Sequence, residues 1–146
     1  MCFEHCICVG SVVNYCNLIE SINEISRILK PGGKVLFDIE TSSSFEFLLT
    51  NKWNRCVDIC EPKYNGEAEK IWIYSTRYIK DVAKLCGLDI LTMKSLNIMP
   101  SLLCAFGLKE EKACFATFLD RMIVKVPIVR SMGSNLIFVC KKRCLL

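Results

Sequence analysis

Near its N-terminus the chain alternates between apolar segments and a segment with helical periodicity. Residues 6–13 read Cys-Ile-Cys-Val-Gly-Ser-Val-Val and predict a strand that ends near Gly10, apolar on both faces like an interior strand of a parallel sheet. Residues 34–40 read Lys-Val-Leu-Phe-Asp-Ile-Glu and predict a second strand. Between these runs, apolar residues recur at the spacing of one helix face: Leu18, Ile19, Ile22, Ile25, Ile28 and Leu29. The order predicts a βαβ unit with parallel strands and a right-handed crossover.

Polar residues and glycines mark the expected ends of this helix. Asn17, with Glu20 three residues later, is typical of a capping box, so the helix is expected to begin after Asn17. The segment Lys30-Pro31-Gly32-Gly33 follows the last apolar position. Proline cannot continue a helix and glycine permits positive φ, so this segment is expected to end the helix and turn the chain into the second strand.

The remaining pattern is weaker. Ser43 with Glu46 predicts the start of a short helix, residues 51–71 look irregular, and residues 72–76 suggest a short strand or a covering segment. Further elements expected along the chain are a helix capped by Thr76 and ended at Gly87, a strand at 88–98, a helix at 109–122 with Pro127 beyond it, and a final strand at 135–142.

Composition limits the class of protein. The chain has 146 residues, of which 52% are hydrophobic and 23% charged, which fits one folded domain and excludes a disordered chain. A net charge of +4 is mild, and the basic residues 141–143 form too small a patch to indicate nucleic-acid binding. No apolar run reaches the roughly 20 residues of a membrane span, and the first residues do not resemble a secretory leader. We therefore expect a cytoplasmic protein without nucleic-acid or membrane partners.

Cysteine is unusually frequent, with eleven residues against a single histidine, His5. No C-x-x-C pair occurs, so zinc-site spacing is absent and we predict no metal site. Many of these cysteines lie inside apolar runs, where the thiol acts as a small hydrophobic group. Reduced, structural thiols are the favoured interpretation. A cysteine-based metal protein stays an alternative that elemental analysis would test.

Several of these segments together resemble a known family. Phe3-Glu4 before an apolar strand, Arg27-Ile-Leu-Lys-Pro-Gly-Gly33, and Val35-Leu-Phe37 resemble the second half of a class I S-adenosylmethionine-dependent methyltransferase. Residues 74–79, residues 85–88 and the final strand resemble the elements that follow in that family, although Glu4 replaces the usual Asp. The resemblance implies an α/β fold: a partial Rossmann-like sheet of the family's strands four to seven with flanking helices, mixed through a terminal antiparallel strand. It also implies transfer of a methyl group from S-adenosylmethionine to a small-molecule or unidentified acceptor.

The resemblance also shows which family motif residues 1–146 do not contain. The family's glycine-rich G-x-G-x-G loop holds the cofactor, and no G-x-G occurs in this sequence. The family's fourth strand pairs with its first, so residues 6–9 are expected to form an apolar edge with unpaired backbone groups. We therefore expect a partial domain, inactive alone, that is a fragment, half of a split enzyme or a self-associating remnant. The first-strand edge would meet a partner chain or a second copy. The alternative is a non-catalytic interaction module.

Candidate site residues follow from the sheet and from the resemblance. Ligands of α/β sheets bind beyond the carboxyl ends of the strands. The resemblance places Gly10, Ser11 and Val12 along the cofactor. Residues expected to contact substrate are Tyr15, Glu40, Trp72 and Tyr74. No catalytic residue can be named, because methyl transfer depends largely on positioning.

Two further expectations concern the strand end and the covering segments. Asp38 and Glu40 lie on the same strand face, as an acid–base pair would, although a carboxylate at a strand end more often caps a loop. The chain is expected to be one partial domain, 1–146, in which residues 51–75 and 99–130 form lid or insertion segments.

Overall fold

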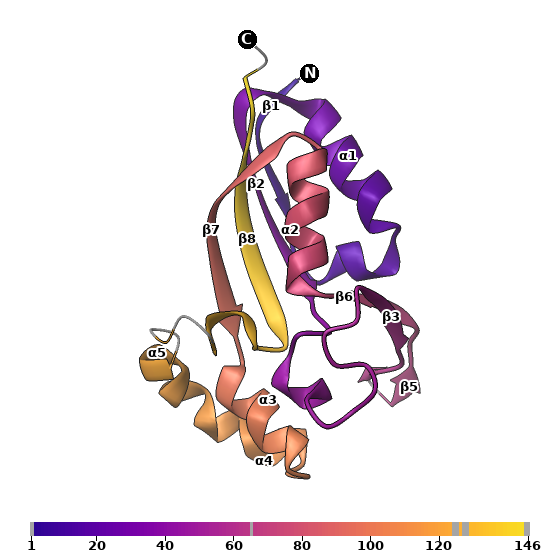
Figure 1. The fold of residues 1–146 in the computed structure, drawn as a ribbon, viewed down its shortest axis with the longest axis vertical. Coiled ribbons are helices and arrows are strands. Elements are labelled where there is room, and N and C mark those ends of the chain that lie inside the picture. The colour runs from indigo at the N-terminus through magenta and orange to yellow at the C-terminus, as the bar shows by residue number, and fades with distance from the viewer. Residues whose placement is uncertain (1, 65, 124–125, 127–128, 145–146) are drawn as a thin grey trace.

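The computed structural model describes residues 2–64, 66–123, 126 and 129–144. Its main sheet contains β1 (Phe3–Cys8), β2 (Leu29–Glu40), β7 (Leu88–Leu96) and β8 (Asn135–Lys142), in the order β1-β2-β8-β7. β1 and β2 are parallel, whereas β8 is antiparallel to both of its neighbours (Figure 1). The expected mixed α/β sheet with a terminal antiparallel strand is therefore confirmed.

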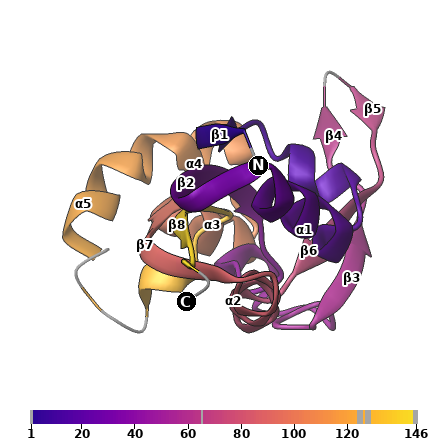
Figure 2. The same cartoon turned by 90° about the horizontal axis from the view of Figure 1, so that it is seen from above.

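Two helices, α1 (Leu18–Ile28) and α2 (Thr76–Leu85), pack side by side against one face of this sheet (Figure 2). The core between them and the sheet is centred on Phe37 of β2 and Phe138 of β8, which are fully buried and stack with ring centroids 5.2 Å apart. Apolar residues from β2, β7, β8 and both helices complete it: Leu18, Ile22, Val35, Ile39, Ile79, Val82, Leu88 and Leu136.

The other face of the sheet carries an exposed apolar row. The register aligns Ile7 of β1 with Leu36 of β2 and Val139 of β8, on the side away from the core. Ile7 is 72% exposed and Val9, just after β1, is 55% exposed. β1 is an edge strand, which confirms the apolar edge expected at residues 6–9, whereas the comparison with an interior strand is wrong for the described chain.

Local sequence explains both helix starts. The Asn17 side chain accepts hydrogen bonds from the backbone N–H groups of Ile19 (3.0 Å) and Glu20 (3.3 Å), which confirms the predicted cap. In α2 the cap is Ser75, one residue before the predicted Thr76, and its hydroxyl accepts from the Tyr78 N–H at 3.2 Å. Gly87 adopts φ 75° directly after α2, as its place at the helix end predicts.

The segment 30–33 differs from expectation. α1 ends at Ile28, and β2 begins directly at Leu29, so no separate turn divides helix from strand. Phe3 pairs with Leu29 and His5 with Lys34, which makes residues 30–33 a bulge in β2, with Gly32 at φ 78°. A Cβ on Gly33 would lie 2.9 Å from the Lys30 carbonyl oxygen, so only glycine fits this tight bend.

A small β-structure lies beyond the carboxyl ends of the main strands (Figure 1). β3 (Val57–Cys60) pairs antiparallel with β6 (Ile71–Tyr74), and β4 (Lys63–Tyr64) with β5 (Glu67–Ala68). The prediction that residues 51–71 are irregular is therefore wrong. The short helix predicted near Ser43 is a 3₁₀ turn, η2 (Phe45–Phe47), and it is capped by Ser44 instead.

The segment after β7 is helical but broken. β7 ends at Leu96 rather than at 98, because Asn97 adopts φ 57°. A helix that the sequence pattern missed follows, α3 (Ile98–Ala105). The predicted helix at 109–122 is instead α4 (Glu110–Ala113), the 3₁₀ helix η3 (Cys114–Leu119) and α5 (Asp120–Ile123). The Asp120 carboxylate accepts from the N–H groups of Ile98 (3.0 Å) and Met99 (2.9 Å), which ties the start of α5 to the start of α3. Pro127 lies outside the described residues.

Within the described part of the chain, no helix combines the length and the apolar character that spanning a bilayer requires.

Candidate functional site

The loop after β1 turns sharply at the carboxyl edge of the sheet. Gly10 (φ 89°) and Ser11 (φ 54°) both adopt left-handed backbone angles, and the 3₁₀ helix η1 (Val12–Tyr15) follows. No heavy atom lies within 4 Å of the position that a Gly10 Cβ would take, and the Val12 side chain is 50% exposed. This loop therefore presents an open backbone surface and one apolar side chain to whatever lies beyond the edge.

Asp38, on the neighbouring strand, holds this loop. Its Oδ1 accepts from the Ser11 N–H at 3.0 Å, and its Oδ2 accepts from Asn135 Nδ2 at 3.3 Å. Asn135 Nδ2 also donates to Ser11 Oγ at 3.3 Å. The carboxylate thus fixes a loop, as a strand-end carboxylate commonly does, and this role differs from that of an acid–base partner for Glu40.

Asn14 forms the other anchor of the loop. Its side chain is fully buried, and Nδ2 donates to the carbonyl oxygens of Glu40 (3.0 Å) and Trp72 (2.6 Å). Its Oδ1 accepts from the Glu40 N–H at 2.9 Å. One side chain therefore ties η1 to the end of β2 and to β6, and it fills a structural role rather than facing a substrate.

Asn135 is a site residue that the sequence reasoning missed. Its Oδ1 is buried and has no hydrogen-bond partner among the described residues. A buried acceptor left without a donor costs about 1–3 kcal/mol, so such atoms need an explanation. The sequence did hold a signal, because the first residue of an antiparallel final strand must lie at the carboxyl edge of its parallel neighbours.

A large pocket, of about 880 Å³, opens beside Asn135. The sheet edge supplies Glu40, Asn97, Ser134 and Asn135 to its wall. The segment around η2 and β3 supplies Glu46, Phe47, Thr50, Asn51, Lys52, Cys60, Glu61 and Pro62, and the end of α3 and the residues after it supply Cys104 and Leu108. Both segments predicted as lids, 51–75 and 99–130, contribute to this wall; whether they move as lids stays a prediction.

Carboxylates dominate the charge of this pocket. Glu40, Glu46 and Glu61 face one lysine, Lys52, whose Nζ donates to the Ile59 carbonyl oxygen at 2.6 Å. Glu61 also lies 3.5 Å from the Lys70 ammonium. Burial, and after it the charge of Glu40, raises the pKa of the Cys60 thiol to about 12. The thiol is therefore protonated at neutral pH and is not a nucleophile.

The other predicted substrate residues lie elsewhere. Trp72 and Tyr74 line a separate hollow of about 190 Å³ beside the start of α1. The Tyr74 hydroxyl donates to the Cys16 carbonyl at 3.1 Å, and its ring stacks on Tyr78 with centroids 5.9 Å apart. Tyr15 donates to the Glu69 carboxylate, which raises the pKa of Tyr15 to about 12. Of the four residues predicted to contact substrate, only Glu40 lies on the large pocket.

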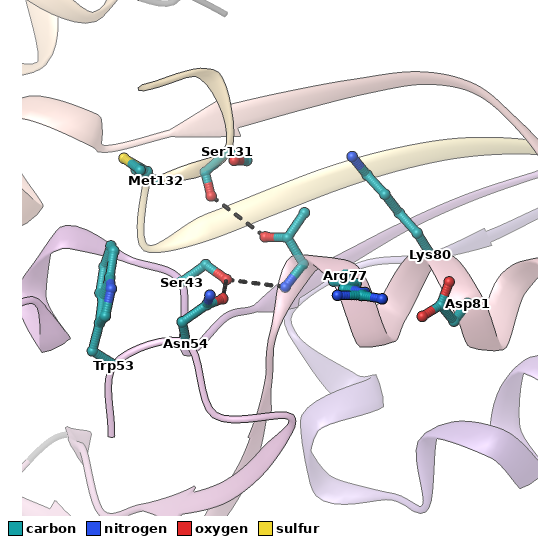
Figure 3. A pocket seen from close by; sticks show the side chains of 9 residues that line it. Ser43, Trp53, Asn54, Arg77, Lys80, Asp81, Ser131 and Met132 are labelled. Atoms are coloured by element: carbon teal, nitrogen blue, oxygen red, sulfur yellow. Dashed lines mark hydrogen bonds between the residues drawn. The ribbon is translucent and has the colours of Figure 1, made fainter. Parts of the chain in front are cut away.

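A third hollow, of about 390 Å³, lies where α2 begins (Figure 3). Its polar groups bind one another: the Thr76 N–H donates to Ser43 Oγ at 3.1 Å, and Ser43 Oγ donates to Asn54 Oδ1 at 3.0 Å. Thr76 Oγ1 donates to the Ser131 carbonyl at 3.5 Å. The charged side chains of Arg77, Lys80 and Asp81 occur on its exposed helix side. The inner polar groups join three segments, which is a structural role.

Among the described residues, no group of three or more His, Cys, Asp or Glu side chains is placed to hold a metal ion.

Comparison with known proteins gives the fold its class. No family model matches the sequence, and no curated protein matches it. A Listeria monocytogenes protein assigned as an S-adenosylmethionine-dependent methyltransferase superposes on 97% of the chain with a TM-score of 0.61 at 9% identity. The glycopeptide N-methyltransferase MtfA, complexed with S-adenosylmethionine, superposes on 98% with a TM-score of 0.53 at 9% identity. A chain of the complex between the Haloferax volcanii methyltransferase activator Trm112 and a protein assigned as a methyltransferase superposes on 99% of the chain. Its TM-score is 0.57 at 14% identity.

These likenesses establish the fold, which is that of the class I S-adenosylmethionine-dependent methyltransferases. The chain spans 62%, 58% and 56% of the lengths of these three proteins.

The residues present fit one wall of a cofactor site. The open space beside Gly10 and the exposed Val12 suit close approach of a flat, partly apolar ligand at this edge. The glycine-rich loop that forms the family's opposite wall does not occur in residues 1–146.

Proposed function

We propose that this chain forms the acceptor-side part of an S-adenosylmethionine-dependent methyltransferase. The observation that carries the proposal is the sheet: parallel β1 and β2 followed by antiparallel β8, aligned with methyltransferases over nearly its whole length. The strands end at a common edge, and the 880 Å³ pocket opens there. The methyl acceptor would be a small molecule held in that pocket.

Each part of the edge has a role in this proposal. Gly10, Ser11 and Val12 would lie along the cofactor, which when bound supplies a methyl group on a sulfonium sulfur. Glu40 would orient the acceptor from the pocket wall. Asp38 and Asn14 hold these residues in place through the hydrogen bonds described above. Trp72, Tyr74 and Tyr15 stay proposed substrate contacts only for an acceptor that extends beyond the pocket.

A second polypeptide surface is part of the proposal. β1 is an edge strand, and the apolar row through Ile7 continues across the open sheet face. Unpaired strand edges and bare apolar faces favour association. We infer that additional chain, covalently joined or not, pairs with β1 and supplies the other wall of the cofactor site. The described cysteines are free, which suits a reducing cytoplasmic location for this function.

Two titrations test the proposal. The first titrates S-adenosylmethionine into the purified chain by calorimetry, and we expect weak binding or none. The second uses a chimera in which the segment preceding the family's fourth strand, taken from the Listeria protein, is fused ahead of β1. The chimera should bind S-adenosylmethionine with a micromolar Kd, and Val12→Asp in the chimera should abolish this binding.

The matched control is Leu85→Asp, an exposed leucine at the far end of α2, which should leave binding unchanged. Micromolar binding of S-adenosylmethionine by the isolated chain would contradict the proposal that additional chain supplies the other wall of the cofactor site. A folded chimera that does not bind would contradict the placement of the cofactor along residues 10–12.

The exposure of Ile7 and Val9 also favours a second function, that of a non-catalytic interaction module. Such a module would form homo-oligomers without cofactor. Co-purification with a glycine-rich α/β partner would instead favour a split enzyme. Sedimentation of the purified chain with and without S-adenosylmethionine separates these outcomes.

A further inference from the structure

The face of the main sheet opposite α1 and α2 carries the apolar row of Ile7, Leu36 and Val139 (Figure 2). On the amino side of this row, the register places Lys34 of β2 directly beside Lys141 of β8. Both lysines are exposed, and neither forms a salt bridge with a described residue. Like charges directly opposite one another on neighbouring strands are destabilising. This pair therefore favours an anionic group from outside the chain.

The charges of this face reverse their order between β2 and β7. On β2, Lys34 precedes the apolar row and Asp38 follows it. On β7, Asp89 precedes the row, in register with the two lysines, and Lys94 follows it, in register with Asp38. A carboxylate accepts about four hydrogen bonds, whereas Asp38 accepts two from described residues and Asp89 accepts one. Both carboxylates can therefore bind a further cation.

A second copy of the chain matches this charge pattern. A half-turn about an axis along the apolar row, at right angles to the strands, places each strand over its own counterpart in the opposite direction. Lys34 then faces Asp38 of the second copy, and the apolar rows face each other. Asp89 likewise faces Lys94 of the second copy, and symmetry forms every such pair twice. A half-turn about an axis parallel to the strands would instead place Lys34 over Lys141 of the second copy, where the two ammonium groups repel.

We propose that the chain forms a weak two-fold dimer through this sheet face, with the apolar rows packed together and the charge pairs on both sides of them. Packed sheets lie about 10 Å apart, a gap that facing side chains fill. The four strands make a face roughly 15–20 Å across. Such a face is small for a protein–protein interface, so we expect a Kd on the order of 10–100 µM. The inference goes beyond methyl transfer, because the dimer forms whether or not a cofactor binds, and it names the partner of the interaction module.

Sedimentation equilibrium of the whole chain at low ionic strength, over loading concentrations of about 5–500 µM, measures this dimerisation. We expect a monomer–dimer equilibrium that weakens at high salt, because salt screens the charge pairs. Lys34→Glu should weaken dimerisation about tenfold, because it places a carboxylate opposite Asp38 of the second copy. The control is Lys84→Glu, the same charge reversal at an exposed position on α2, on the other side of the sheet, and it should leave dimerisation unchanged.

A charge swap on β7 locates the contact. Asp89→Lys and Lys94→Asp should each weaken dimerisation several-fold, and the double variant should restore it, because both pairs then form with reversed sign. The exposed salt bridge between Asp89 and Arg143 is lost in the single Asp89 variant and is not restored by the swap, so recovery reports the contact between copies. Circular dichroism checks that each variant is folded.

The same variants separate the sheet face from the sheet edges. A dimer that paired through the edge of β1 would not respond to substitutions on β7, at the opposite edge. A dimer that paired through β7 would not respond to Lys34→Glu on the inner strand β2. A monomer at every concentration, a dimer that ignores Lys34→Glu, or a double variant as weak as the single ones would overturn the inference. Any of these results together with cofactor binding by the chimera would refute the sheet-face contact alone.

Discussion

Asn14→Ala is the substitution from which we expect the clearest loss of stability. The side chain is fully buried and makes three hydrogen bonds, two to backbone carbonyls and one from a backbone N–H. Each such bond contributes about 1 kcal/mol net, so removal of all three predicts a loss of about 3 kcal/mol. That loss is a large share of the 5–15 kcal/mol by which domains are typically stable.

Urea unfolding followed by circular dichroism measures this loss. Asn14→Asp keeps the acceptor for the Glu40 N–H but lacks the two N–H donors of the amide. Its loss of stability should be smaller than that of Asn14→Ala if the carboxyl group is neutral, and larger if the group stays charged while buried. Asn23→Ala, an exposed asparagine on α1, is the control and should change the free energy of unfolding by less than about 0.7 kcal/mol. A loss below about 1 kcal/mol in Asn14→Ala would refute the view that this residue joins η1, β2 and β6.

Three further predictions follow from single contacts. Asn17→Ala removes the cap of α1 and should cost about 1 kcal/mol in urea unfolding, whereas Asn17→Ser should cost much less. Phe138→Ala empties the stacked core and should cost about 3–5 kcal/mol by the same assay; a loss like that of a surface substitution would contradict the core described here. The pKa of Tyr15 is raised from 10.0 to about 12, so the stabilisation from its bond to Glu69 is present below pH 10 and is lost as pH rises through about 12. In an NMR titration of the tyrosine ring carbons, Glu69→Gln should lower the Tyr15 midpoint toward 10.0, and an unchanged midpoint would exclude the bond.

The elements that local sequence determines could be predicted. The parallel pairing of β1 with β2 followed from two apolar runs joined by one helical segment, the pattern of a βαβ unit. The start of α1 followed from Asn17, whose cap involves only the next three residues. β8 was predicted with its observed bounds, because a polar turn precedes a clear apolar run.

Features that depend on distant segments could not be predicted. The bulge at 30–33 is set by the register against β1, which the segment itself does not encode. The helix predicted at 109–122 is interrupted by η3, and Asp120 at the start of α5 binds the start of α3, a contact across 22 residues. The pocket gathers residues from the sheet edge, η2, β3 and α3, so only Glu40, at the end of a predicted strand, was within reach of sequence reasoning.

The central claim is that β1 pairs with β2 along one edge and that its other edge is open for pairing with additional chain. Hydrogen exchange at residues 6–9 tests this claim most directly. In a monomeric sample, alternate amides of this segment should differ, with those directed at β2 protected and those on the open flank exchanging nearly as fast as in an unfolded chain. Slow exchange of every amide from 6 to 9 in a stable monomer would contradict the account, because no open edge would then exist.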